Sequence, residues 1–214
     1  MTDLTINEIF HSIQGESSYM GLPCVFVRLT YCNLRCTWCD TEYAFYEGTG
    51  MSLEEIMAKV EKYGCKVVEV TGGEPLAQEG VFPLMKMLCD RGYQVLLETS
   101  GSMSIERVDP RVRRIVDFKC PGSGMEKKNL WENVDHLTSI DEVKFVIGSR
   151  EDFDWAVEVI RQYNLDRRCP VLMSPVFDDL QPIELAEWIL ESKINIRFQL
   201  QMHKFIWEPE TRGV

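Results

Sequence analysis

The sequence Cys24-Val25-Phe26-Val27-Arg28-Leu29-Thr30 leads directly into Tyr31-Cys32-Asn33-Leu34-Arg35-Cys36-Thr37-Trp38-Cys39-Asp40-Thr41. The first run is rich in β-branched and apolar residues, which predicts a buried strand. The second run is polar and holds three cysteines, so it predicts a loop that begins where the strand ends. Because ligands gather at the carboxyl ends of strands in α/β folds, we expect the active site at this loop, residues 30–41.

Further strand-like runs recur along the chain, and amphipathic helical segments separate most of them. A capping box of Ser52 and Glu55 opens one helix, and Gly92 ends another. Strands separated by helices pair in parallel through right-handed crossovers, which places the chain in the α/β class. The further strands are predicted at residues 66–71, 94–99, 114–119, 142–147, 171–173 and 195–201.

The length of the chain restricts its architecture. The chain has 214 residues, whereas a complete eight-fold β/α barrel typically needs about 250. We therefore expect an incomplete TIM-type β/α barrel of about six parallel strands. No linker or repeat divides the sequence, so we expect a single domain over residues 1–214.

Composition excludes several classes of protein. Hydrophobic residues make up 45% of the chain and charged residues 27%, as in globular proteins. Asp and Glu outnumber Lys and Arg by 34 to 23, and a net charge of −11 disfavours a nucleic-acid partner. No stretch approaches the roughly 18 apolar residues of a membrane span, and Met1-Thr2-Asp3-Leu4 shows no secretory pattern. We expect a cytoplasmic protein with no membrane partner.

Three of the eight cysteines, Cys32, Cys36 and Cys39, have a C-x3-C-x2-C spacing. Thiolates are soft ligands that select zinc, copper or iron–sulfur clusters. A structural zinc site takes four ligands, so the alternatives are zinc completed by a distant Cys or His, or no metal at all. On a four-iron cluster, three thiolates leave one iron open to a small molecule, which implies chemistry. Cysteines 65, 89 and 169 fit apolar patterns and are interpreted as core residues.

A second motif, Val70-Thr71-Gly72-Gly73-Glu74-Pro75, ends the next predicted strand. Two glycines let the backbone approach a ligand closely, and a carboxylate accepts hydrogen bonds from an ammonium group. Gly-Gly-x-Pro is also a common structural turn. The position of the motif, one βα unit after the cysteine loop, favours a binding role.

The cysteine spacing, with Trp38 before the last cysteine, resembles the cluster loop of the radical S-adenosylmethionine (SAM) enzymes. This resemblance implies a [4Fe–4S] cluster whose unique iron is chelated by SAM. It implies reductive cleavage of SAM to a deoxyadenosyl radical, driven by an external reductant of the flavodoxin or ferredoxin type. Cluster potentials reach about −700 mV, as such a reduction requires. The glycine-rich motif resembles the family's site for the methionine amino group.

Over nearly its whole length, the chain also resembles the 7-carboxy-7-deazaguanine synthase family, in residues 8–17, Arg28, Cys39-Asp40-Thr41 and residues 197–204. The resemblance implies a radical SAM lyase that converts 6-carboxy-5,6,7,8-tetrahydropterin to 7-carboxy-7-deazaguanine with loss of ammonia. This reaction leads to deazapurine nucleosides such as queuosine. The resemblance further implies Mg²⁺ and a homodimer.

The resemblance also assigns roles to individual residues. Arg28 pairs with the pterin carboxylate, which its planar guanidinium suits, the alternative being a strand-edge ion pair. Glu16 holds the guanidine-like edge of the pterin or is a solvated acid, and Thr41 is the Mg²⁺ ligand, with Asp40 beside it. Gln14, Glu16 and Arg28 form the expected catalytic group. Substrate contacts are expected from Ile13, Gln14, Gly15, Arg28, Thr71, His203 and Val214, the last two in a substrate-side segment, residues 195–214.

The expected SAM contacts lie at the carboxyl ends of predicted strands. Lys144 lies inside a strand and can face either way. Two features depart from the family pattern: residues 117–121 read Asp-Phe-Lys-Cys-Pro where many relatives carry Ser-Pro-Lys, and eleven residues follow His203, which leaves open whether Val214 reaches the site. The expected SAM contacts are Trp38, Asp40, Gly73, Glu74, Thr99, Ser100, Lys119, Cys120, Pro121, Met173, Ser174 and Pro175.

Two other functions compete with this interpretation. A glycyl-radical activating enzyme shares the cysteine spacing and the glycine motif but acts on a protein substrate. The segment 13–16 together with Arg28 suits a small heterocyclic acid instead. The second alternative is a noncatalytic iron–sulfur or zinc protein, which would release no deoxyadenosine on reduction.

Overall fold

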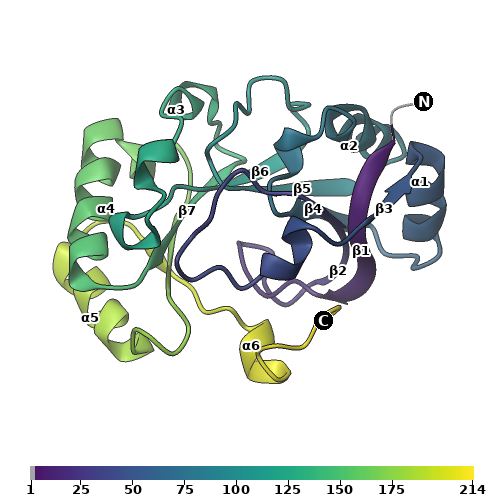
Figure 1. The fold of residues 1–214 in the computed structure, drawn as a ribbon. Helices are drawn as coiled ribbons and strands as arrows, with labels where there is room; N and C mark the ends of the chain where they lie inside the picture. Colours follow the sequence, from purple (N-terminus) through teal and green to yellow (C-terminus); the bar gives the residue numbers. More distant parts are fainter. Residues whose placement is uncertain (1–2) are drawn as a thin grey trace.

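The computed structural model describes residues 3–214, so Met1 and Thr2 of the N-terminal tetrapeptide lie outside the described residues. The chain forms one nine-stranded sheet in the order β3-β1-β2-β4-β5-β6-β7-β8-β9 (Figure 1). From β2 to β9 every neighbouring pair is parallel. The strands are β1 Leu4–Ile13, β2 Pro23–Leu29, β3 Thr49–Met51, β4 Val67–Gly72, β5 Gln94–Thr99, β6 Arg113–Asp117, β7 Glu142–Ile147, β8 Val171–Pro175 and β9 Arg197–Phe198.

Helices cover the outer face of the sheet (Figure 1). The predicted capping box is confirmed, because Ser52 Oγ accepts a 3.2 Å hydrogen bond from the Glu55 amide, and Gly92 follows α2 with a φ of 77°. The α-helices are α1 Leu53–Glu61, α2 Val81–Asp90, α3 Asn133–His136, α4 Arg150–Tyr163, α5 Pro182–Ser192 and α6 His203–Ile206. Short 3₁₀ turns span Glu42–Phe45, Pro75–Ala77, Pro121–Ser123, Glu126–Lys128 and Leu165–Arg167.

The sheet is an open barrel, as predicted. Its two end strands, β3 and β9, do not pair with each other in the part of the chain that the structure describes. The antiparallel strands β1 and β3 were not predicted, and they extend the sheet beyond β2. The strand predicted at residues 195–201 is shorter, because only Arg197–Phe198 pairs with β8.

The hydrophobic core lies between the sheet and its helices, so the other face of the sheet is free to hold a site. Successive strand residues point to opposite faces. On β4, Val68 and Val70 belong to the core, whereas Glu69 and Thr71 line a cavity on the concave face. Among the described residues, no helix has the length and apolar character needed to cross a membrane.

Candidate active site

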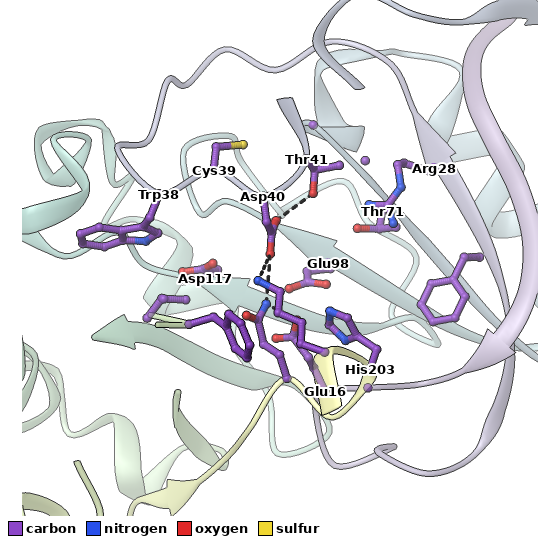
Figure 2. Close-up of a pocket in the computed structure, with 18 of the residues that line it drawn as sticks. Glu16, Arg28, Trp38, Cys39, Asp40, Thr41, Thr71, Glu98, Asp117 and His203 are labelled. Carbon is purple, nitrogen blue, oxygen red and sulfur yellow. Dashed lines mark hydrogen bonds and ion pairs between the residues drawn. The ribbon is translucent and has the colours of Figure 1, made fainter. Parts of the chain in front are cut away.

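A cavity of about 670 Å³ lies at the carboxyl ends of the parallel strands (Figure 2). The cysteine loop forms one side, and the segment after β1 and the C-terminal residues form the other. The structure thereby brings together most of the predicted site. The predicted residues that line the cavity are Ile13, Gln14, Gly15, Glu16, Arg28, Cys32, Cys36, Trp38, Cys39, Asp40, Thr41, Thr71, Gly73, Thr99, Ser100, Lys119, His203 and Val214.

The cysteine loop is held by its own main chain and by the glycine-rich motif. Arg35 Nη1 donates to the carbonyl oxygens of Cys32, at 2.8 Å, and Leu34, at 2.6 Å. Gly73 packs directly against the loop: a Cβ atom there would lie 2.3 Å from the Tyr31 carbonyl oxygen and 2.7 Å from Cys32 Cβ. The close approach of these two segments therefore requires glycine at position 73.

The donor set of the loop fits an iron–sulfur cluster. Cys32, Cys36 and Cys39 are free thiols that line one cavity. Burial raises the pKa of each thiol, while the ammonium group of Lys119 acts in the opposite direction on all three. Within residues 3–214, no three His, Cys, Asp or Glu side chains already converge as a set of metal ligands. Binding of a cluster requires thiolates and therefore displaces the protons of the three thiols.

Glu74 does not line the cavity itself but holds two residues that do. Its fully buried carboxylate accepts hydrogen bonds from Thr99 Oγ1 at 2.9 Å, the Ser100 amide at 2.8 Å and the Leu76 amide at 3.0 Å. These bonds tie the end of β4 to the end of β5. Thr99 and Ser100 are thus presented to the cavity by Glu74, whose own side chain is fully used.

Five more of the predicted SAM contacts have side chains outside the lining of the cavity. Lys119, which follows β6, lines the cavity, whereas Cys120 and Met173 belong to the hydrophobic core. Pro175 lines a separate, smaller cavity, and Pro121 begins a 3₁₀ turn. These five residues are Cys120, Pro121, Met173, Ser174 and Pro175, and their contact with SAM stays a prediction.

Arg28 is both a strand ion pair and a cavity residue. Its Nε donates a 2.8 Å hydrogen bond to Glu8 Oε1 across the β1–β2 pairing, and the Tyr43 hydroxyl donates to the same oxygen at 2.9 Å. Arg28 pairs in register with Thr71 of β4, and Figure 2 shows both side chains at one end of the cavity. The Nη groups have no hydrogen-bond acceptor within residues 3–214. A guanidinium with free Nη donors is suited to an incoming carboxylate.

A charged network forms the floor of the cavity. Lys144 faces the cavity and contacts the carboxylates of Glu16 and Glu98, the latter at 2.8 Å. Burial raises the pKa of Glu16, but the charge and hydrogen bond of Lys144 outweigh it and hold the pKa below its usual value. For Glu98, burial dominates and raises the pKa. Lys119 pairs with Asp117 at 2.8 Å, so each lysine compensates a buried acid.

The C-terminal segment closes the cavity against the cysteine loop. Lys204 Nζ lies 3.1 Å from Asp40 Oδ2, and Gln201 Nε2 donates to both Asp40, at 3.2 Å, and Glu16, at 3.1 Å (Figure 2). Burial opposes ionisation of Asp40, yet Lys204 and the hydrogen bonds from Thr41 and Gln201 hold its pKa well below the usual range. Val214 lines the cavity, which answers the question left open by the extra residues after His203.

Comparisons with known proteins agree with this arrangement. The sequence profile of the Radical SAM superfamily matches residues 27–121. A 7-carboxy-7-deazaguanine synthase of Koribacter versatilis is 48% identical, over 99% of this chain and 100% of the relative. The enzyme of the same name from Chlorobaculum tepidum is 47% identical, over 99% of this chain and 97% of the relative. This chain belongs to the 7-carboxy-7-deazaguanine synthase family.

Structural similarity extends over the same length. The crystal structure of QueE from Escherichia coli superimposes with a TM-score of 0.80 at 24% identity, covering 95% of this chain and 96% of the other. The open barrel is therefore shared with a solved structure. Archaeal TYW1 is more distant, with a TM-score of 0.56 at 14% identity over 81% of this chain.

Sequence reasoning missed several polar residues of this synthase-family cavity, namely Glu69, Glu98, Asp117, Gln201 and Lys204. A signal for three of them was present. Each lies two residues before a predicted site residue, as Glu69 does before Thr71 and Glu98 before Ser100, and residues i and i+2 of a strand share a face. A charged residue inside an apolar strand, two positions before a predicted site residue, thus indicated the floor of the site.

Proposed function

We propose that this chain is a radical SAM lyase that converts 6-carboxy-5,6,7,8-tetrahydropterin to 7-carboxy-7-deazaguanine with release of ammonia. The observation that carries the proposal is a single cavity that is lined both by the three cysteines of the loop and by Arg28 and Thr71. The full-length similarity to synthases of that name supports the same reaction. A glycyl-radical activating enzyme would need room for a protein segment, whereas here residues 209–214, with Gln201, His203 and Lys204, line the cavity.

Cys32, Cys36 and Cys39 would hold the [4Fe–4S] cluster that radical SAM enzymes use. When bound, the cluster and SAM supply the one-electron reduction and the hydrogen abstraction that start the reaction. Trp38 offers an aromatic face to SAM, and Gly73 allows close approach of the main chain. The remaining SAM contacts are Asp40, Thr99, Ser100 and Lys119.

The substrate would be held at the opposite end of the cavity. The Nη groups of Arg28 bind the pterin carboxylate, and Arg28 remains charged because Tyr43 and Glu8 raise its pKa against the effect of burial. Glu16, kept ionised beside Lys144, accepts hydrogen bonds from the guanidine-like edge of the pterin. The other substrate contacts are Ile13, Gln14, Gly15, Thr71, His203 and Val214.

Thr41 would be the protein ligand of Mg²⁺. Its hydroxyl lies 2.9 Å from Asp40 Oδ1, and the lowered pKa of Asp40 keeps a carboxylate beside the site. Two adjacent oxygen groups at a cavity wall fit a hard cation that takes its other ligands from substrate and water. The magnesium ion would orient the substrate with respect to the cluster loop.

The proposal also covers the domain organisation, the oligomeric state, the electron donor and the location of the protein. We expect a single radical SAM domain that forms a homodimer and receives electrons from a flavodoxin- or ferredoxin-like protein. Cluster ligands must stay reduced, which fits a cytoplasmic location. We expect neither a nucleic-acid nor a membrane partner, in agreement with the net charge of −11.

The test is conversion of the pterin by protein reconstituted without oxygen. Incubation with SAM, a reductant, Mg²⁺ and 6-carboxytetrahydropterin should give 7-carboxy-7-deazaguanine and ammonia, measured by mass spectrometry and an ammonia assay. Arg28→Met should raise KM for the pterin at least tenfold, while Arg150→Met, in an exposed pair with Asp154, should behave as wild type. Deoxyadenosine release without any deazapurine would contradict the proposed reaction.

A further inference from the structure

Glu69 is an acidic residue in the middle of a buried parallel strand. It lies on β4 in register with Phe26 of β2 and Leu96 of β5, and only 3% of its surface is exposed. Its sequence neighbours Val68 and Val70 are fully buried core residues. Burying a carboxyl group is costly unless it is paired or un-ionised. The charge state of Glu69 therefore depends on which groups surround it.

The direct partner of Glu69 is Gln14. Gln14 Nε2 donates a hydrogen bond to Glu69 Oε2, and Gln14 Oε1 accepts one from the Glu16 amide at 2.9 Å. Gln14 is itself 3% exposed and lines the cavity. These two bonds hold both ends of the amide, so they fix which edge Gln14 presents to a ligand. Without Glu69, a buried donor would lose its partner and the amide would be free to turn.

The titratable and charged groups that face Glu69 come from four parts of the fold. They are Glu16 after β1, Cys24 and Arg28 on β2, Glu98 on β5 and Lys144 on β7. Lys144 already contacts Glu16 and Glu98, and Arg28 is engaged by Glu8. Within residues 3–214, no cation makes an ion pair with Glu69. Three carboxyl groups thus surround one ammonium group. Glu16 and Glu98 contact it directly, so its charge favours their ionisation more than that of Glu69.

Electrostatics agree with this geometry. Burial, followed by repulsion from Glu98 and Glu16, raises the pKa of Glu69 well above its usual value. The attraction of Lys144 and Arg28 acts in the opposite direction but is smaller. Glu69 therefore ionises less readily than an ordinary glutamate, and it ionises only as the pH rises through its elevated pKa.

We propose that Glu69 is a positioning residue that, as an un-ionised carboxyl group, fixes the amide of Gln14 at the substrate end of the cavity. The proposal deepens the function proposed above and rests on it. An un-ionised Glu69 adds no negative charge next to the carboxylate-bearing pterin. Its ionisation at alkaline pH would repel that anion and weaken binding.

The test compares Glu69→Gln with Glu69→Leu. Gln keeps an acceptor for Gln14 and cannot ionise, so at pH 7 its kcat/KM should stay within about twofold of wild type. Leu removes the acceptor, so KM for the pterin should rise about tenfold with a smaller change in kcat. Between pH 7 and 9.5, KM of the wild type should rise several-fold more than KM of Glu69→Gln.

A second measurement uses the protein without cofactors. Infrared difference spectra of wild type minus Glu69→Gln at pH 7 should show the carbonyl band of a protonated carboxyl group, and this band should disappear at alkaline pH. The absence of the band, or a Gln variant more than tenfold impaired at pH 7, would overturn the proposal. If the wild type makes no deazapurine, the proposed function fails on its own, and the infrared band still decides whether Glu69 is un-ionised.

Discussion

The ammonium group of Lys144 on β7 donates a 2.8 Å hydrogen bond to Glu98 Oε1 on β5, reaching across the intervening strand β6. The same ammonium group contacts Glu16, which follows β1. One buried cation therefore links three segments that are far apart in the sequence. It sets the charge of the cavity floor, because Glu16 and Glu98 are close enough to repel each other.

Lys144→Met should impair both stability and activity. Removing one partner from a buried ion pair leaves uncompensated carboxylates, which costs about 3 kcal/mol of unfolding free energy. Ionised Glu16 is destabilised without its partner, so kcat/KM should fall by about a hundredfold. Urea unfolding and steady-state kinetics measure the two effects.

The pH dependence of this variant has a defined sign. The lowered pKa of Glu16 means that its contribution to stability is present above the ordinary glutamate pKa of 4.5 and is lost as the pH falls through the folded value. The deficit of Lys144→Met should therefore be complete at pH 8 and shrink only as the pH falls from 4.5 toward 3. The matched control is Lys86→Met, in an exposed pair with Asp90. A deficit that is constant over this range would argue against the electrostatic explanation.

Gly73→Ala should displace the cysteine loop. The added Cβ would meet the Tyr31 oxygen at 2.3 Å, and overpacking of this kind costs about 1–3 kcal/mol. We expect iron content after reconstitution to fall clearly below that of the wild type. Gly50→Ala is the control, since a Cβ there has no neighbour within 4 Å. Equal iron content in the two variants would show that the close approach of Gly73 is unimportant.

Asp141→Asn tests a structural ion pair away from the cavity. The Asp141 carboxylate is fully buried and accepts hydrogen bonds from Arg114 Nε at 2.9 Å and from the Thr138 amide at 2.7 Å. Loss of its charge should cost about 3 kcal/mol, a decrease in Tm of roughly 6–12 °C for a chain of this size. Asp154→Asn, in an exposed pair, should change Tm by less than about 2 °C. If the two variants melt together, the buried pair is not stabilising.

His203 should titrate at an unusually low pH. Burial lowers the pKa of its imidazole below the ordinary value of 6.5, although Glu16 and Asp40 act in the opposite direction. At neutral pH the ring is then uncharged and can both donate and accept a hydrogen bond toward a ligand. Imidazole NMR titration of the protein without cofactors measures this value, with His203→Asn identifying the signal. A midpoint at or above 6.5 would contradict the assignment.

The sequence was sufficient to predict the parallel part of the sheet but not its antiparallel edge. The apolar alternation of β1, visible at Leu4 and Ile6, is interrupted because a bulge between Ile6 and Glu8 shifts the register. β3 is only three residues long and contains Gly50, so it carries almost no pattern. Neither strand therefore had a local signal comparable to that of β2 or β7.

In the candidate site, too, some residues were predictable from the sequence and others were not. Cys32, Cys36 and Cys39 have a spacing that is informative by itself, and all three line the cavity. The orientation of Lys144 was not predictable. The alternation of side chains along a strand tells which residues share a face of the sheet, but not which face lines the cavity. That choice depends on the curvature of the sheet and on where the helices pack. The position of Val214 likewise depends on how residues 203–214 fold back, with Arg212 over the Tyr43 ring.

The most direct measurement of the central claim is the metal content of protein reconstituted without oxygen, together with its cleavage of SAM on reduction. The account predicts a four-iron cluster in the wild type and in Cys169→Ala, a buried core position. Both should release deoxyadenosine, whereas Cys39→Ala should hold no intact cluster and release none. A wild-type protein that binds one zinc ion and leaves SAM intact, or a Cys39→Ala variant that cleaves SAM as well as the wild type, would contradict the account.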